Sequence, residues 1–172
     1  QVIWCLLQID PDTQLHVFNT HMQSTHTDWP RERSDIARAR QVEDLARFVR
    51  GKMQETQCPS LICGDFNLDA IGEPLDYMRM MDILRRELNV LLLVNGWELR
   101  NLCGDEHTPT YGMCGERMLT LKKDQDNELC LDYTLYIGPR SGGDEAHTES
   151  LSGGDDFPQL SDHRAIVSKI NL

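Results

Sequence analysis

The segment PSLICGDFN, from Pro59 to Asn67, places a short apolar run directly before two polar side chains. The apolar centre, residues 61–63, lies between Pro59 and Gly64, which is typical of a short buried strand. Asp65 and Asn67 follow at the C-terminal end of that strand. The segment therefore predicts a buried strand that ends in a carboxylate and an amide.

Further strands are predicted on both sides of this segment. Residues 2–9 and 15–20 are apolar or aromatic, and the turn-forming residues 10–13 lie between them, which predicts a β-hairpin. Residues 131–137 and 165–170 have the composition of two more strands. We expect loops over residues 101–115 and over the Gly-, Asp- and Ser-rich residues 138–158.

Two helices are predicted between the strands. Over residues 31–50, apolar residues recur at helical spacing, with arginines on the other faces and Gly51 just past the end. The apolar residues of this helix are Ile36, Ala39, Val42, Ala46 and Val49. Pro74 suits the first turn of a second helix that runs to about Leu88. Strands that alternate with helices indicate an α/β architecture in one domain, residues 1–172, without internal repeats.

The composition is that of one compact globular domain, with 172 residues, 40% hydrophobic and 26% charged. The 17 basic and 28 acidic residues give a net charge of -11, which disfavours binding to nucleic acid unless a local patch or a bound cation inverts the field. No apolar stretch approaches the roughly 18 residues of a transmembrane helix. Compartment and oligomeric state are left open.

The chain opens inside an apolar run, with neither an initiator Met nor the pattern of a signal peptide. We therefore expect a piece of a longer fold. Six cysteines without a C-x-x-C pair predict neither a disulfide scaffold nor a zinc site. A bridge between Cys103 and Cys114 is left open, because it depends on the compartment.

Polar groups gather where the predicted strands end, as a hydrolytic site requires. His163 is a candidate general base, because a carboxylate on one imidazole nitrogen leaves the other free to take a proton. Asp65 is expected either to orient His163 or to hold the attacking water. Asn67 offers an amide donor to a substrate oxygen, and protonated His21 would stabilise charge on that oxygen.

The chain resembles the endonuclease/exonuclease/phosphatase superfamily through four segments in the family's order. They are Asn19-Thr20-His21, Gly64-Asp65-Phe66-Asn67, Leu131-Asp132-Tyr133 and Ser161-Asp162-His163. Within the superfamily, the details are most similar to the neutral sphingomyelinases. The similar segments are 20–24, 37–45 with Arg40, Gln41 and Glu43, 64–69 followed by Tyr77-Met78, and Pro109-Thr110-Tyr111. Residues 140–156 and the step Thr134-Leu135 depart from that pattern.

The resemblance implies a DNase I-like four-layer α/β sandwich and a Mg²⁺-dependent hydrolase. It implies that His163 is the general base, that Asp65, Asn67 and Asp162 bind metal, and that His21 and Asn67 contact the phosphate. The implied substrate is sphingomyelin at a membrane surface, with ceramide and phosphocholine as products. Alternatives are another phosphoesterase of the superfamily, such as a nuclease or an inositol polyphosphate phosphatase, and a non-catalytic binding module.

The resemblance also implies that this chain holds only the C-terminal half of the sandwich. The superfamily's main metal-binding glutamate aligns upstream of Gln1. We therefore expect the isolated segment to be inactive and poorly folded, because the inner faces of its strands lose their packing partners.

Overall fold

The computed structural model describes residues 1–25, 28, 30–102, 109–111, 129–139, 147–151, 163 and 165–170. The elements in these residues follow one another in a mixed order of strands and helices. They are β1 (Val2–Gln8), β2 (Gln14–His21), α1 (Arg31–Thr56), β3 (Ser60–Asp65), α2 (Pro74–Asn95), β4 (Trp97–Asn101), β5 (Asp132–Pro139), β6 (His147–Leu151) and β7 (Ala165–Lys169).

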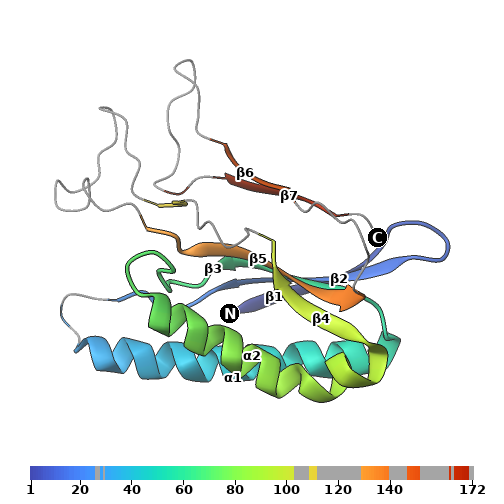
Figure 1. Cartoon of the computed structure of the whole chain (residues 1–172), viewed down its shortest axis with the longest axis horizontal. Helices are drawn as coiled ribbons and strands as arrows, with labels where there is room; N and C mark the ends of the chain where they lie inside the picture. The colour runs from blue at the N-terminus through green and yellow to red at the C-terminus, as the bar shows by residue number, and fades with distance from the viewer. Residues whose placement is uncertain are drawn as a thin grey trace.

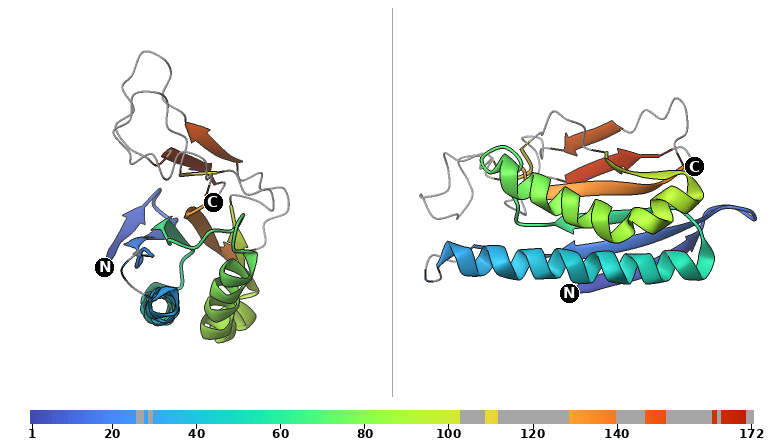
Figure 2. Two further views of the ribbon diagram at one scale, coloured as in Figure 1. Left: turned by 90° about the vertical axis from the view of Figure 1, so that its left-hand side faces the viewer. Right: turned by 60° about the horizontal axis from the view of Figure 1, so that its bottom comes forward.

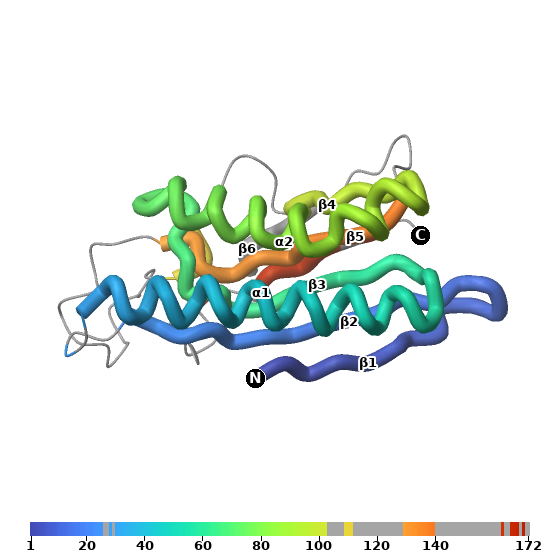
Figure 3. The backbone as a smooth tube through the Cα atoms, turned by 90° about the horizontal axis from the view of Figure 1, so that it is seen from below, coloured from blue at the N-terminus to red at the C-terminus, as the bar shows by residue number. Residues whose placement is uncertain are grey.

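The described elements form layers (Figure 1). A five-stranded sheet has the order β1-β2-β3-β5-β4, with β2 and β3 parallel and the other neighbours antiparallel. Both helices cover one face of this sheet, and the β6–β7 pair lies on the opposite side (Figure 2). Seen from the helix side, α1 runs along β2 and β3 while α2 runs beside β5 and β4 (Figure 3).

The strand register separates the two faces of the five-stranded sheet. Phe18, Ile62 and Leu135 are paired neighbours across β2, β3 and β5, and all three are fully buried in the core. Because side chains alternate along a strand, residues an even number of positions from this row share its face and the others lie on the opposite face. The core therefore lies between the sheet and the helices.

The first helix differs from its prediction in length and in its buried face. α1 continues through Gly51 to Thr56, because Met53 in the last turns is fully buried, and Gln57 ends it in the left-handed conformation. Ile36 is 49% exposed, whereas Arg38 is only 1% exposed. Arginines were expected on the polar faces, so Arg38 is an exception that needs a reason.

The second helix starts at Pro74, as predicted, but runs past Leu88 to Asn95. It ends at Gly96, which adopts a left-handed φ of 64° and donates its N–H to the Leu92 carbonyl. Leu88 and Leu91 are buried, so the extra turns contribute to the core. Two strands were not predicted: β4, whose last residue Asn101 was assigned to a loop, and β6, which lies inside the expected 138–158 loop.

His16 is fully buried beneath α1, and both of its ring nitrogens have partners. Trp4 donates its indole N–H to Nδ1 at 3.0 Å, so Nδ1 carries no proton. Nε2 then donates to the Thr56 hydroxyl at 2.7 Å. Burial lowers the pKa of His16 below its usual value.

This neutral histidine should make the fold sensitive to acid. The unfolded chain protonates His16 near pH 6.5, whereas the folded chain resists protonation because of the lowered pKa, so the free energy of unfolding should fall as pH drops below about 6.5. Urea unfolding at a series of pH values measures this slope. His16→Gln should flatten it, and an equally steep slope in that variant would contradict the assignment.

Among the described residues, no helix has both the length and the apolar character that a bilayer crossing needs. The four cysteines described, Cys5, Cys58, Cys63 and Cys130, form no disulfide with one another. Cys103 and Cys114 lie outside the described residues.

Candidate active site

Three neighbouring strands place one polar residue each in a single row. His21 at the end of β2 pairs in register with Asp65 at the end of β3, and Asp65 pairs with Asp132 at the start of β5. This row is an odd number of positions from the core row, so it lies on the face opposite the helices. Two carboxylates directly opposite each other are unfavourable unless a cation lies near them. The row is therefore a candidate site rather than a structural feature.

His163 completes this group from the segment before β7. Its Nδ1 hydrogen-bonds Asp132 Oδ2 at 2.8 Å, while its Nε2 lies 3.8 Å from Asp65 Oδ2. The carboxylate that orients His163 is thus Asp132, and not Asp65 as one sequence hypothesis had it. With the Nδ1 proton on the hydrogen bond to Asp132, Nε2 is left as an acceptor.

The segment 109–111 holds both members of this pair. The Thr110 hydroxyl, 3% exposed, accepts the backbone N–H groups of Leu131 and Asp132, each at 3.1 Å. Tyr111 forms a β-bridge with His163, and the two rings lie edge to face at 5.1 Å. The Pro-Thr-Tyr segment, which the sequence offered without a role, therefore fixes Asp132 and His163.

Asp65 lies at the centre of the row. Its Oδ1 accepts the Asn67 backbone N–H at 2.8 Å, and its Oδ2 lies 3.5 Å from His21 Nε2. Burial raises the pKa of Asp65, and the charge of Asp132 raises that pKa further, whereas the Asn67 N–H and both histidines lower it. The preceding Gly64 has a φ of 130°, and a Cβ there would lie 1.9 Å from the Thr20 carbonyl oxygen. Only glycine lets β3 approach β2 this closely before Asp65.

The raised pKa of Asp65 predicts that Asp65→Asn stabilises the fold at neutral pH. Asp65 favours the folded state below its unfolded pKa of about 3.9, and this contribution is lost as pH rises through the higher folded pKa. At pH 7 the variant should therefore unfold at higher urea than the wild type, because its amide oxygen still accepts the Asn67 N–H. The difference in urea stability between the variant and the wild type should be smaller at pH 3. Asp44→Asn, an exposed carboxylate on α1, is the control, and a destabilised Asp65→Asn at pH 7 would contradict this account.

Asn67 has a left-handed φ of 52° and already has a partner for its amide. Its Nδ2 donates to the Met22 carbonyl at 3.1 Å, so one of its two amide hydrogens is committed to the backbone rather than to a substrate. The amide oxygen is not part of that bond. Asn67 therefore links the segment after His21 to the end of β3.

The loop after Asn67 is fixed by two buried side chains. Asp69 accepts the backbone N–H groups of Ile71, Gly72 and Cys130. The Tyr133 hydroxyl lies 2.6 Å from the Cys130 carbonyl oxygen and accepts the Ala70 N–H at 3.0 Å. These bonds hold the start of β5 against the loop, which keeps Asp132 beside Asp65.

The structure brings together His21, Asp65, Asn67 and His163 of the predicted site residues. Asp162, a predicted metal ligand, lies outside the described residues. Asp132 was missed as a site residue, although its segment was among the four that carry the resemblance. The available signal was the position of Asp132, the second residue of the predicted 131–137 strand, in one of those four segments.

The donor chemistry of the site fits part of a shell for a hard divalent cation. Asp65 and Asn67 offer a carboxylate and an amide oxygen, and Mg²⁺ prefers oxygen ligands, often one or two carboxylates with phosphate and water. In the part of the chain that the structure describes, no group of three or more His, Cys, Asp or Glu side chains is arranged to hold a metal. A complete shell would thus need substrate or further residues.

No protein-family model matches the chain, and no curated protein sequence matches it. Solved structures do match. Beta toxin from Staphylococcus aureus is 17% identical, with 98% of this chain and 56% of that chain covered and a TM-score of 0.72. Sphingomyelinase C from Streptomyces griseocarneus is 18% identical, with coverages of 98% and 56% and a TM-score of 0.62. An endonuclease/exonuclease/phosphatase family protein from Leptotrichia buccalis is 16% identical, with coverages of 99% and 54% and a TM-score of 0.52.

The chain therefore has the α/β fold of these solved structures, as the sequence predicted. It spans little more than half the length of the solved structures it matches. Its helix layer, five-stranded sheet and β6–β7 pair correspond to part of a DNase I-like sandwich. One of the matching beta toxin structures contains bound magnesium ions.

Proposed function

We propose that the chain is the C-terminal half of a metal-dependent phosphodiesterase that hydrolyses sphingomyelin to ceramide and phosphocholine. The observation that carries the proposal is the row His21, Asp65 and Asp132 with His163 bonded to Asp132. Asp132 orients His163 as a general base, and Asp65 lies beside it as a second, partly buried carboxylate. Such an arrangement can activate a water molecule. The fold shared with sphingomyelinases supports the choice of a phosphodiester substrate.

In this proposal His163 takes a proton from water at Nε2. Nδ1 keeps its proton on Asp132 Oδ2, so the imidazolium that forms is stabilised by that carboxylate. A water molecule bonded to both His163 Nε2 and Asp65 Oδ2, which lie 3.8 Å apart, would be oriented for attack. The water oxygen bonds to phosphorus, the bond from phosphorus to the ceramide oxygen breaks, and that oxygen ends with a proton.

His21 is proposed as the phosphate contact. Its side chain is 74% exposed and reaches Asp65 Oδ2 at 3.5 Å, so it lies at the open side of the row. In its protonated form it would donate to a phosphoryl oxygen and offset the charge that develops there. Asn67 is proposed to act beside it, with the hydrogen that Met22 does not use.

Mg²⁺ is the proposed cofactor, with Asp65, Asn67 and Asp162 as ligands from this chain. When bound, the ion would neutralise charge on the phosphodiester. The pairing of Asp65 with Asp132 supports this assignment, because two neighbouring carboxylates need a counter-charge. The proposed partner is the phospholipid substrate at a membrane surface.

The test is release of phosphocholine from sphingomyelin vesicles with Mg²⁺ and with EDTA. It should use the 172-residue chain and any longer natural form of it, since the solved structures that match are nearly twice as long. Release that requires Mg²⁺ is the expected result for the longer form, whereas the 172-residue chain alone should be inactive. A longer form that cleaves nucleic acid or inositol phosphates but not sphingomyelin would reject the substrate, and one that cleaves none would favour a binding module.

A further inference from the structure

The segment that follows His21 is held from two directions. On the site side, the Met22 N–H donates to the Asp65 carbonyl at 2.9 Å, and the Met22 carbonyl accepts from Asn67 at 3.1 Å. Met22 is 3% exposed, so this backbone is buried against β3. The position of His21 opposite Asp65 therefore depends on where this segment lies.

Helix α1 binds the same segment one residue later. Arg38 donates through Nη1 to the Gln23 carbonyl at 3.1 Å and to the Thr25 hydroxyl at 3.0 Å. Gln41, one turn further along α1, accepts the Gln23 N–H at 2.9 Å through its Oε1. Both backbone groups of Gln23 are thus bonded to side chains of α1.

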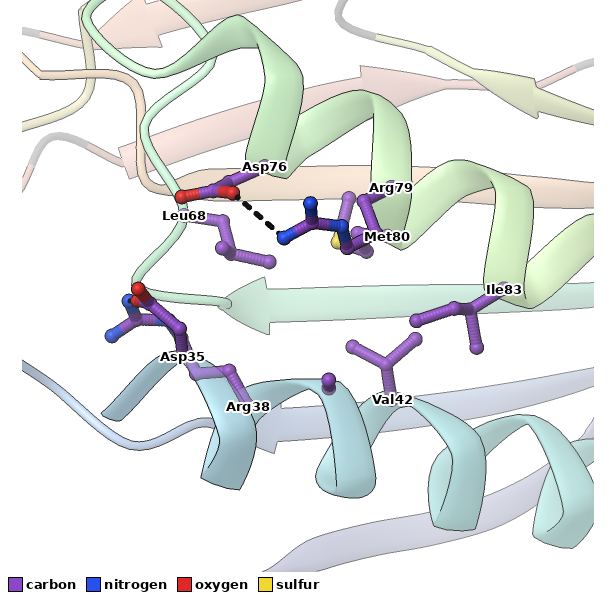
Figure 4. Close-up of a pocket in the computed structure, with 9 residues that line it drawn as sticks. Asp35, Arg38, Val42, Leu68, Asp76, Arg79, Met80 and Ile83 are labelled. Carbon is purple, nitrogen blue, oxygen red and sulfur yellow. Dashed lines mark hydrogen bonds and ion pairs between the residues drawn. The ribbon is translucent and has the colours of Figure 1, made fainter. Parts of the chain in front are cut away.

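Burial of the charged Arg38 side chain carries a desolvation penalty that its contacts must offset. Its side chain is only 2% exposed and pairs through Nη2 with Asp35. It lines a small cavity of about 20 Å³ between α1 and α2, where Figure 4 shows it beside Asp35. A buried ion pair is often no more stable than apolar residues of similar volume. A planar guanidinium, however, holds several acceptors in a fixed geometry.

We propose that Arg38 and Gln41 are positioning residues, which fix Gln23 and so hold His21 opposite Asp65. The catalytic part of this inference rests on the proposed function, whereas the structural part does not. Within the described residues, Arg38 bonds to this segment at the Gln23 carbonyl and the Thr25 hydroxyl and makes no contact with His21, Asp65 or His163. Its loss should therefore change turnover more than substrate binding.

The test compares Gln41→Met and Arg38→Lys with the control Arg47→Met. Gln41→Met removes one acceptor and leaves the buried charge pair intact, so it remains informative if the Arg38 variant folds poorly. Arg47 lies on α1 and is 55% exposed. Among the described residues Arg47 pairs with Asp44, and it takes no part in the hydrogen bonds of residues 22–25.

Amide hydrogen exchange of the longest natural form tests, without any substrate, whether Arg38 and Gln41 fix residues 22–25. In Gln41→Met and in Arg38→Lys, the Met22 and Gln23 amides should exchange about tenfold faster, as loss of a hydrogen bond requires. Arg47→Met should leave both unchanged. A Met22 amide that exchanges at the wild-type rate in both variants would overturn the inference.

Turnover of bis(p-nitrophenyl) phosphate by the longest natural form tests the catalytic consequence. Gln41→Met and Arg38→Lys should lower kcat by about 10-fold to 100-fold, the range expected for a displaced group, with KM within about twofold of the wild type. Unchanged kcat in both would overturn the inference. A wild type that is inert toward both this substrate and sphingomyelin, together with faster Met22 exchange in the variants, would reject the proposed function and support the positioning of residues 22–25 by α1.

Discussion

His163→Ala should lower phosphodiester turnover by about 10²-fold to 10⁴-fold, the usual contribution of a general base. The imidazole lies between two carboxylates: its Nδ1 is 2.8 Å from Asp132 Oδ2 and its Nε2 is 3.8 Å from Asp65 Oδ2. The bond to Asp132 orients the ring as a general base requires. Without it, water keeps Asp65 as a partner but loses its proton acceptor. The loss should therefore appear in kcat.

The measurement is kcat for phosphocholine release by the wild type and by His163→Ala at neutral pH. Added imidazole should restore part of the activity of His163→Ala, because the side chain is 28% exposed and solvent can enter the space it leaves. Turnover within about threefold of the wild type would remove His163 from the role of base.

The parts of the fold that are encoded locally could be predicted from the sequence. The apolar run before Gly64 predicts a strand, and the turn-forming residues 10–13 predict a hairpin. Pro74 predicts the start of a helix. The ends of the helices could not be predicted as well. α1 passes Gly51 because burial of Met53 outweighs the cost of roughly 1 kcal/mol that glycine brings to a helix.

The parts of the site that depend on register could not be predicted. Asp132 faces Asp65 only because β5 pairs antiparallel with β3, and nothing near residue 132 in the sequence specifies that neighbour. For the same reason Asp65 was a candidate for the carboxylate that orients His163. Arg38 was expected on a solvated face of the helix, because the helical pattern considers only residues of the helix itself. It does not reveal that the Gln23 carbonyl, which lies outside the helix, accepts a hydrogen bond from Arg38 in the interior.

Asp132→Asn should lower kcat by about 10⁴-fold, as in other sites where a carboxylate fixes a histidine tautomer. An asparagine can turn its NH₂ toward His163 Nδ1, which would place the imidazole proton on Nε2. The base would then have no lone pair directed at water, although every atom remains close to its place. KM should change little, because no proposed phosphate contact is removed.

Two measurements distinguish this account from simple unfolding. The double variant with His163→Ala should be no slower than the slower single variant, because the pair acts as one unit. The matched control is Asp76→Asn, a carboxylate of α2 paired with Arg79, which should keep wild-type turnover. Losses that multiply in the double variant would show that Asp132 acts independently of His163.

The same substitution should also change the ionisation of Asp65. The charge of Asp132 is one cause of the raised pKa of Asp65, so its removal should lower that pKa toward the usual range. Carboxyl chemical shifts followed through an acid titration would measure this change. An Asp65 pKa that does not fall in Asp132→Asn would mean that burial alone sets it, and that the two carboxylates do not share one electrostatic site.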